Sequence, residues 1–135
     1  MRVVISAKAQ RTDRGAAAVE FALVLPLLVI LVFGIIDFGR LFHAQITVTQ
    51  GAREGSRLAA LGLPDVENRT AQAATGLGLT ASAVTVTACP VGATQTTDAV
   101  VSVRYTLNFS TPMTGLVGLP ASKVLTGTGY MPCQG

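Results

Sequence analysis

The residues best suited to chemistry lie where a basic leader meets a long apolar run. Glu20 is the one charged residue between Ala16 and Ile36. A carboxylate inside an apolar segment of membrane length is costly to bury and usually marks a functional site with a charged partner. If the chain were cut after Gly15, Ala16 would carry a free ammonium about one helical turn from Glu20. In a packed array, Glu20 could pair with that ammonium of a neighbouring subunit and offset the burial of both charges.

The same carboxylate has a simpler interpretation. Glu20 lies near the start of the apolar run and close in sequence to Arg14. A charged side chain at that depth can extend toward the lipid headgroups while its stem stays in the apolar region. The residues alone leave both interpretations open.

The apolar run itself predicts a retained membrane helix. Residues 16–36 are 21 in number, and about 20 apolar residues are needed to cross the roughly 30 Å of hydrocarbon in a bilayer. A removable signal peptide has a shorter apolar stretch, about 7–15 residues, followed by a small-residue cleavage site. Here the run is longer, and Asp37-Phe38-Gly39-Arg40 follows it without such a site. A secreted product would require this helix to be removed.

Charge asymmetry predicts the orientation. Residues 1–15 carry four basic residues and one acidic residue, a net of +3, whereas residues 16–135 carry six of each and are neutral. Basic residues beside a membrane helix stay in the cytoplasm, so we expect a cytoplasmic leader at 1–15 and an extracytoplasmic chain after about residue 37. The basic excess belongs wholly to the leader and gives no indication of nucleic-acid binding.

A helical pattern continues beyond the apolar run. Small and apolar residues recur every three or four positions, which predicts one helix from about 16 to 61, with its outer part, 37–61, as a stem. These residues are Leu41, Ala44, Val48, Ala52, Gly55 and Ala59. Gly62 and Pro64 are typical of a helix end. Pro26 should bend the membrane part, and the Gly51/Gly55 pair indicates close packing, not a membrane dimer motif.

The remainder, residues 62–135, predicts a small extracytoplasmic α+β domain. Residues 65–75 favour a short helix, and alternating or β-branched runs predict strands near 84–87, 101–109 and 124–131, the last weakened by Gly127 and Gly129. Residues 112–120 are expected to form a loop or one helical turn. The fold class is therefore α+β and pilin-like: a long N-terminal helix, a short helix and a three- to four-stranded antiparallel sheet.

The two cysteines fall in the predicted extracytoplasmic part. Cys89 follows the first strand and Cys133 the third, which in an antiparallel meander brings both to one edge. An even cysteine count outside the cytoplasm favours a disulfide, with two free thiols as the alternative. We expect no metal site, because the chain has no CxxC motif and only one histidine, His43.

Three stretches resemble a known family. Residues 14–26 read RGAAAVEFALVLP, residues 33–40 read FGIIDFGR and residues 52–60 read AREGSRLAA. A glycine followed five residues later by glutamate and an aromatic residue, ahead of a long apolar helix, is similar to the processing site of type IV pilin-like proteins. The whole stretch from about 14 to 61 resembles the TadE-like family, minor pilin-like proteins of tight-adherence (Flp) pilus systems.

That resemblance implies processing and assembly. A prepilin peptidase would cut between Gly15 and Ala16, leaving Glu20 and Phe21 just after the cut. The protein would be a minor pilin or pseudopilin that helps to assemble a Tad (Flp) pilus or secretion apparatus by helix packing in the membrane. Its partners would be another TadE-like subunit, the main Flp-type pilin and the Tad membrane platform. The alternative is an unprocessed single-pass anchor that presents a small binding domain.

Composition argues against catalysis. With one histidine, no arguable Ser-His-Asp spacing and no glycine-rich phosphate loop, the chain shows no constellation typical of an enzyme. We therefore expect no catalytic residues, no cofactor and no small-molecule substrate.

Overall fold

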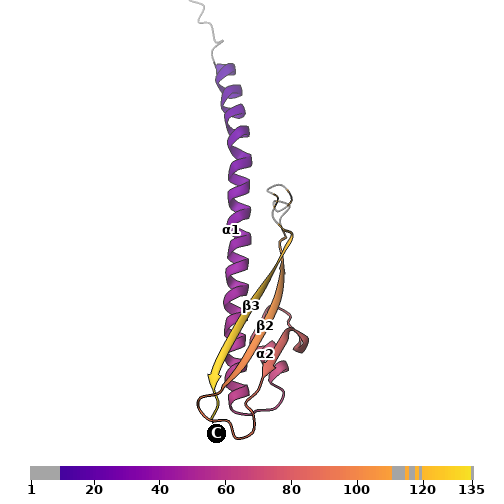
Figure 1. Cartoon of the computed structure of the whole chain (residues 1–135). Coiled ribbons are helices and arrows are strands. Elements are labelled where there is room, and N and C mark those ends of the chain that lie inside the picture. Colours follow the sequence, from indigo (N-terminus) through magenta and orange to yellow (C-terminus); the bar gives the residue numbers. More distant parts are fainter. Residues whose placement is uncertain (1–9, 111–114, 116–117, 119, 135) are drawn as a thin grey trace, which may run out of the picture. The chain divides into compact units, whose positions relative to one another are not determined.

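The computed structural model describes residues 10–110, 115, 118 and 120–134 (Figure 1). The elements, in order, are α1 (Gln10–Ala60), α2 (Val66–Ala73), the 3-10 turn η1 (Ala81–Ala83), β1 (Val84–Thr87), β2 (Asp98–Asn108) and β3 (Ser122–Pro132). The chain divides into two compact units, Met1–Ile36 and Asp37–Gly135, and α1 contributes to both. The predicted α+β class is confirmed.

The first unit contains the apolar part of α1. This helix includes an 18-residue window with a mean hydropathy of 2.8, none of it buried, so its length and composition suit a membrane span. Leu23, for example, is 75% exposed. The described helix starts at Gln10, earlier than the predicted start near 16. Pro26 lies inside the helix, and the bend expected there stays a prediction.

The end of α1 agrees with the predicted stop. The N–H of Leu63 donates to the carbonyl of Leu58, and the N–H of Gly62 donates to the carbonyl of Ala59, at 3.1 Å each. Gly62 has a φ of +64°, the left-handed conformation that glycine adopts without strain. Together these bonds form a Schellman cap, which satisfies carbonyls that the helix end would otherwise leave unpaired.

The sheet is the predicted antiparallel meander, with three strands in the order β1-β2-β3. Val103 of β2 lies opposite both Val84 of β1 and Gly127 of β3. β2 and β3 are longer than predicted, because their backbone pairing continues past the apolar alternation into the polar residues Asp98 and Ser122. The short helix α2 lies within the predicted range 65–75. Most of the loop predicted at 112–120 lies outside the described residues.

The core of the second unit forms where α1 meets the inner face of the sheet. The predicted alternation in β2 is confirmed: Val101 and Val103 are fully buried, whereas Arg104 is exposed. The predicted stripe of small residues on α1 supplies the opposite wall, with Val48 and Ala52 fully buried. Side chains of this size let a helix approach a sheet closely.

Figure 1 shows β3 running beside α1. Two glycines of β3 lie where the two backbones approach each other. A Cβ atom added at Gly127 would lie 2.7 Å from the carbonyl oxygen of Val48, and one added at Gly129 would overlap the carbonyl oxygen of Ala52. The sequence indicated only that these glycines weaken the strand. In the structure they are the residues that let the strand contact the helix backbone.

The Gly51/Gly55 pair serves packing within the chain, as expected. A Cβ atom at Gly51 would lie 3.0 Å from Cβ of Ala74, which follows α2, and one at Gly55 would overlap Oγ1 of Thr70 in α2. Thr70 is fully buried. These glycines therefore seat α2 against α1.

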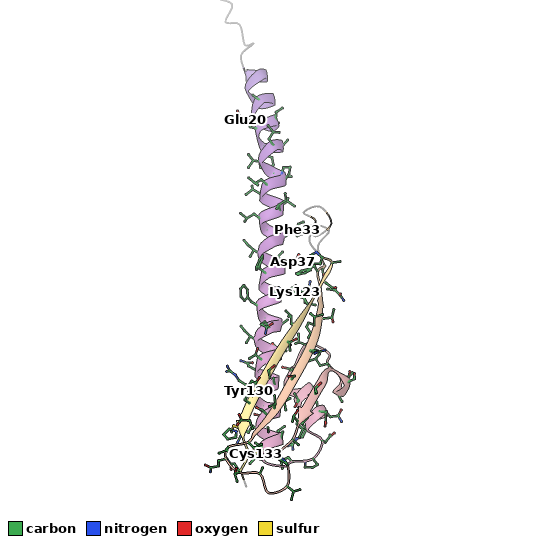
Figure 2. All side chains as sticks on the ribbon, viewed as in Figure 1. Glu20, Phe33, Asp37, Lys123, Tyr130 and Cys133 are labelled. Atoms are coloured by element: carbon green, nitrogen blue, oxygen red, sulfur yellow. A yellow bond between two sulfur atoms is a disulfide. The ribbon has the colours of Figure 1, made fainter. Side chains whose placement is uncertain are left out.

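The two cysteines form the expected disulfide (Figure 2). Cys89 follows β1 and Cys133 follows β3; their Cα atoms are 5.8 Å apart and their positions differ by 44 in sequence. Cys133 is fully buried, and its N–H donates to the carbonyl of Thr97 at 2.8 Å. The bridge joins the ends of the two outer strands of the sheet.

Substitution of Gly129 by alanine should strongly destabilise the second unit. The new methyl group would overlap the α1 backbone, which cannot move without disturbing the core, and such overpacking costs about 1–3 kcal/mol or more. Gly39→Ala is the matched control, because nothing lies within 4 Å of the added Cβ and alanine favours a helix. Denaturant unfolding of the full chain in mild detergent, followed by far-UV circular dichroism, measures both. Equal stability of the two variants would contradict the close contact.

Loss of either cysteine should have the same effect. Cys89→Ala and Cys133→Ala each open the same loop, for which the chain-entropy model gives an upper figure of about 4 kcal/mol in stability. On non-reducing gels both variants should migrate like the reduced wild-type chain, and each should expose one thiol to labelling. Different mobilities for the two variants would show that these cysteines are not partners.

Candidate assembly site

The N-terminal cluster lies on the exposed surface of α1. Glu20 lies on the N-terminal part of α1 (Figure 2), and Gly15, Ala16 and Phe21 are exposed as it is. A Cβ atom added at Gly15 would meet nothing within 4 Å. Ala16 and Glu20 are four residues apart in a continuous helix, so they share one face. Among the described side chains, none forms an ion pair or hydrogen bond with Glu20. The cluster is thus available to another molecule.

The Gly15–Ala16 peptide bond lies inside α1, since the helix begins at Gln10. The leader and the apolar run had been expected to divide at this point; in the structure the helix continues through it. A cut here would leave Ala16 as the first residue of the remaining helix. Its ammonium would then lie at the positive end of the helix dipole, where a nearby carboxylate is favourable.

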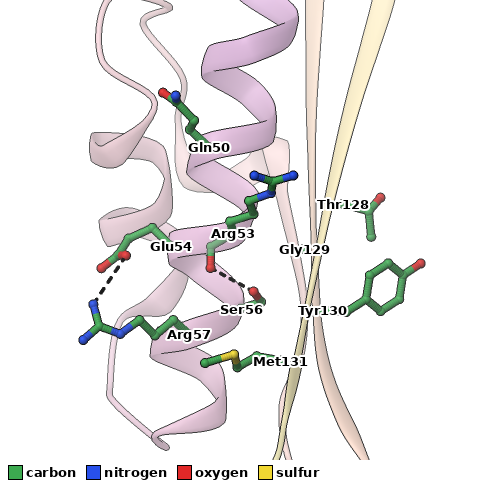
Figure 3. A pocket seen from close by; sticks show the side chains of 9 residues that line it. All are labelled: Gln50, Arg53, Glu54, Ser56, Arg57, Thr128, Gly129, Tyr130 and Met131. Atoms are coloured by element: carbon green, nitrogen blue, oxygen red, sulfur yellow. Dashed lines mark hydrogen bonds and ion pairs between the residues drawn. The ribbon is translucent and has the colours of Figure 1, made fainter.

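A second candidate surface lies in the other unit, between α1 and β3 (Figure 3). It is an open groove of about 630 Å³. The residues lining it are Gln50, Arg53, Glu54, Ser56 and Arg57 of α1 and Thr128, Gly129, Tyr130 and Met131 of β3. The sequence did not indicate this groove. Only the folded sheet places β3 beside Arg53 and Arg57.

Charge in the groove is unbalanced. Arg57 pairs with Glu54 at 3.9 Å, and both side chains are exposed, so this ion pair contributes at most about 1 kcal/mol. The guanidinium of Arg53 has no acidic partner among the described residues. The carbonyl of Arg53 accepts a 2.8 Å hydrogen bond from Oγ of Ser56, a buried residue. The α1 wall therefore has one more positive than negative side chain.

The described part of the chain holds no group of three His, Cys, Asp or Glu residues arranged to bind a metal ion. Its two cysteines are joined to each other. What the two surfaces offer is packing area, a carboxylate on an apolar helix and, in the groove, a guanidinium beside a strand.

A comparison with known proteins finds a family match in the helical part of the chain. The family model of TadE-like proteins matches residues 15–57, a range that contains Ala16, Glu20, Phe21 and Pro26 and ends within α1. No curated protein and no solved structure matches the chain. The resemblance seen in the sequence is thereby confirmed for the helix, while the sheet lies outside the match. Residues 15–57 therefore match the TadE-like family, and this match implies a component related to Tad pilus systems.

Proposed function

We propose that this protein is a minor pilin or pseudopilin that helps to assemble a Tad (Flp) pilus or secretion apparatus by helix packing in the membrane. The observation that carries the proposal is the spacing of Gly15 and Glu20 on an exposed, membrane-length helix within the TadE-like match. The helix has the apolar surface that such packing requires. Its one acidic residue within 16–36 is available for pairing.

Two independent features support a single-pass orientation with the N-terminus in the cytoplasm. The net charge of +3 in residues 1–15 favours a cytoplasmic leader. The Cys89–Cys133 disulfide favours an oxidising compartment for the second unit, because cytoplasmic thiols are kept reduced. The sheet is therefore proposed to lie outside the cytoplasm, either in the periplasm or at the cell surface.

The proposed processing step is cleavage between Gly15 and Ala16 by a prepilin peptidase. It would remove the basic leader and create an ammonium at Ala16. Burying an ammonium or a carboxylate alone in an apolar medium has a high free-energy cost. The cost is much lower when the two charges are buried in contact with each other. Glu20 of one subunit would therefore pair with Ala16 of the next, and the exposed ring of Phe21 would pack beside them.

The partners follow from this arrangement. Helix packing in the membrane requires other pilin-like subunits, for which a second TadE-like chain and the main Flp-type pilin are the proposed candidates, together with the Tad membrane platform. No nucleic acid or small-molecule substrate enters the proposal.

An unprocessed membrane anchor that presents a small binding domain is the second candidate function. The groove beside β3 favours it, since that surface needs no cleavage to be exposed. Neighbouring genes distinguish the two cheaply. A secretion ATPase, a Tad-type platform and a prepilin peptidase nearby favour the pilus component.

Mass spectrometry of the mature N-terminus tests the processing step. The wild-type chain should begin at Ala16 in cells with the peptidase and at Met1 in cells without it. Gly15→Ala should leave the leader attached, because the peptidase recognises the residue before the cut. Gly39→Ala, a glycine elsewhere in α1 with open space around it, should be processed normally. An intact Met1 terminus in wild-type cells would remove the processing step from the proposal.

Glu20→Gln should separate membrane insertion from assembly. The amide keeps the size of the side chain but loses the charge, so the span should still insert while pilus number falls by about tenfold or more, the effect of losing a desolvated ion pair. Glu67→Gln, an exposed acid on α2, is the control and should assemble normally. Carbonate extraction measures insertion, and electron microscopy counts pili. Failure of the Glu20 variant to insert would assign the residue to topology instead.

A further inference from the structure

β3 is an edge strand, and two hydrogen bonds define which of its backbone groups face outward. The N–H of Phe109 donates to the carbonyl of Ala121, and the N–H of Cys133 donates to the carbonyl of Thr97. In β3 and its flanking residues, the odd-numbered positions therefore point their backbone N–H and carbonyl groups toward β2. Because successive residues of a strand alternate in direction, the even-numbered residues of β3 point theirs toward the free edge.

A third hydrogen bond agrees with this assignment and limits the open part of the edge. Nε2 of Gln45 in α1 donates to the carbonyl of Thr126 at 3.2 Å, which covers that carbonyl. At the other end, Pro132 has no N–H. Between them, the outward N–H and carbonyl groups of Thr128 and Tyr130 have no hydrogen-bond partner within the described residues. An unpaired edge of this kind is a template for another strand.

The groove lies beside this same open stretch (Figure 3). The side chains of Thr128 and Tyr130 lie on the side of β3 away from α1, whereas that of Met131 points toward the helix. A segment paired with the edge would therefore place alternate side chains over the groove, against Arg53 and Arg57 of α1. Backbone pairing and side-chain recognition would occur together.

The charge of the groove defines the chemistry of the occupant. Arg57 is engaged with Glu54, whereas Arg53 has no acidic partner in the described chain. A guanidinium forms its strongest hydrogen bonds with a carboxylate, often through two parallel N–H donors. An aspartate or glutamate on the groove-facing side of the added segment would supply the missing partner.

We propose that the edge of β3 at Thr128 and Tyr130, together with Arg53, binds an extended, carboxylate-bearing segment of a partner protein by strand addition. This surface is separate from the helix contacts of the proposed pilus function and does not depend on cleavage at Gly15. It gives the second unit an interaction of its own, with affinity from the backbone and specificity from the arginine.

The test uses the full isotope-labelled chain in detergent micelles and a short synthetic peptide of alternating valine and glutamate. Titration should shift the amide resonances of Thr128 and Tyr130 and slow the exchange of their protons with solvent. A peptide with lysine in place of glutamate should bind at least about tenfold more weakly, because charge-assisted hydrogen bonds to Arg53 are replaced by repulsion. An acidic peptide N-methylated along one edge should lose binding, since it cannot pair with β3.

Two variants separate the contribution of backbone pairing from that of the arginine, and a third serves as the control. Thr128→Pro removes one outward N–H that bonds nothing within the described residues, together with a long, 3.3 Å hydrogen bond between the hydroxyls of Thr128 and Ser102. The backbone pairing of β3 with β2 is untouched, so the fold should persist while peptide binding falls by about tenfold or more. Unchanged resonances of Val101 and Val103 confirm that the core is intact. Arg53→Glu should reverse the preference between the acidic and basic peptides. Arg104→Glu, a charge reversal on an exposed residue of β2 outside the groove, should bind as the wild type does.

Several outcomes would overturn the proposal. If the peptide shifted only the arginine side-chain resonances, and did so equally in the wild type and in Thr128→Pro, it would be bound as an anion and not by strand addition. Equal affinity for the acidic and basic peptides would remove the carboxylate from the partner. Concentration-dependent shifts at Thr128 and Tyr130 without any peptide would show that a second copy of this chain occupies the edge. Failure of these tests leaves the mass-spectrometric result for Gly15 unaffected, so the two proposals stand or fall separately.

Discussion

The contact between the backbone of α1 and β3 is the constraint on which the second unit depends. At Gly127 and Gly129 the strand leaves no room for a side chain, because the carbonyls of Val48 and Ala52 occupy that space. With the strand held there, β2 presents Val101 and its apolar neighbours to the small residues of α1. The polar face of α1 is left beside the free edge of β3, which creates the groove.

The two units use α1 in different ways. Between Val19 and Ile36 most of its side chains are large, apolar and exposed, as suits a surface that meets lipid or other helices. Beyond Asp37 the helix has small residues on the face it buries against the sheet and α2, and polar residues on the rest. Its TadE-like match ends at residue 57, so the family signature covers the helix and not the sheet that packs on it.

Local patterns were sufficient to predict the elements but not their contacts. The apolar run, the spacing of Ala44, Val48 and Ala52, and the alternation in β2 each depend on neighbouring residues, so helix, strands and meander followed from the sequence. The disulfide could be predicted because a meander brings Cys89 and Cys133 to one edge. The role of Gly129 could not, since a glycine in a strand does not reveal which backbone approaches it. The groove depends on the register of β3 against both β2 and α1, which no local pattern defines.

The disulfide also has a mechanical consequence. Cys89 and Cys133 enclose β2, β3 and the segment that joins them in one covalent loop, whose two ends are 5.8 Å apart between Cα atoms. If tension were applied between α1 and the C-terminal end, residues within the loop could unfold without lengthening the chain between the points of attachment. Only residues 61–88 between the helix and the bridge could be drawn out. The bridge therefore limits how far this protein can be extended by force, whatever the fate of the sheet.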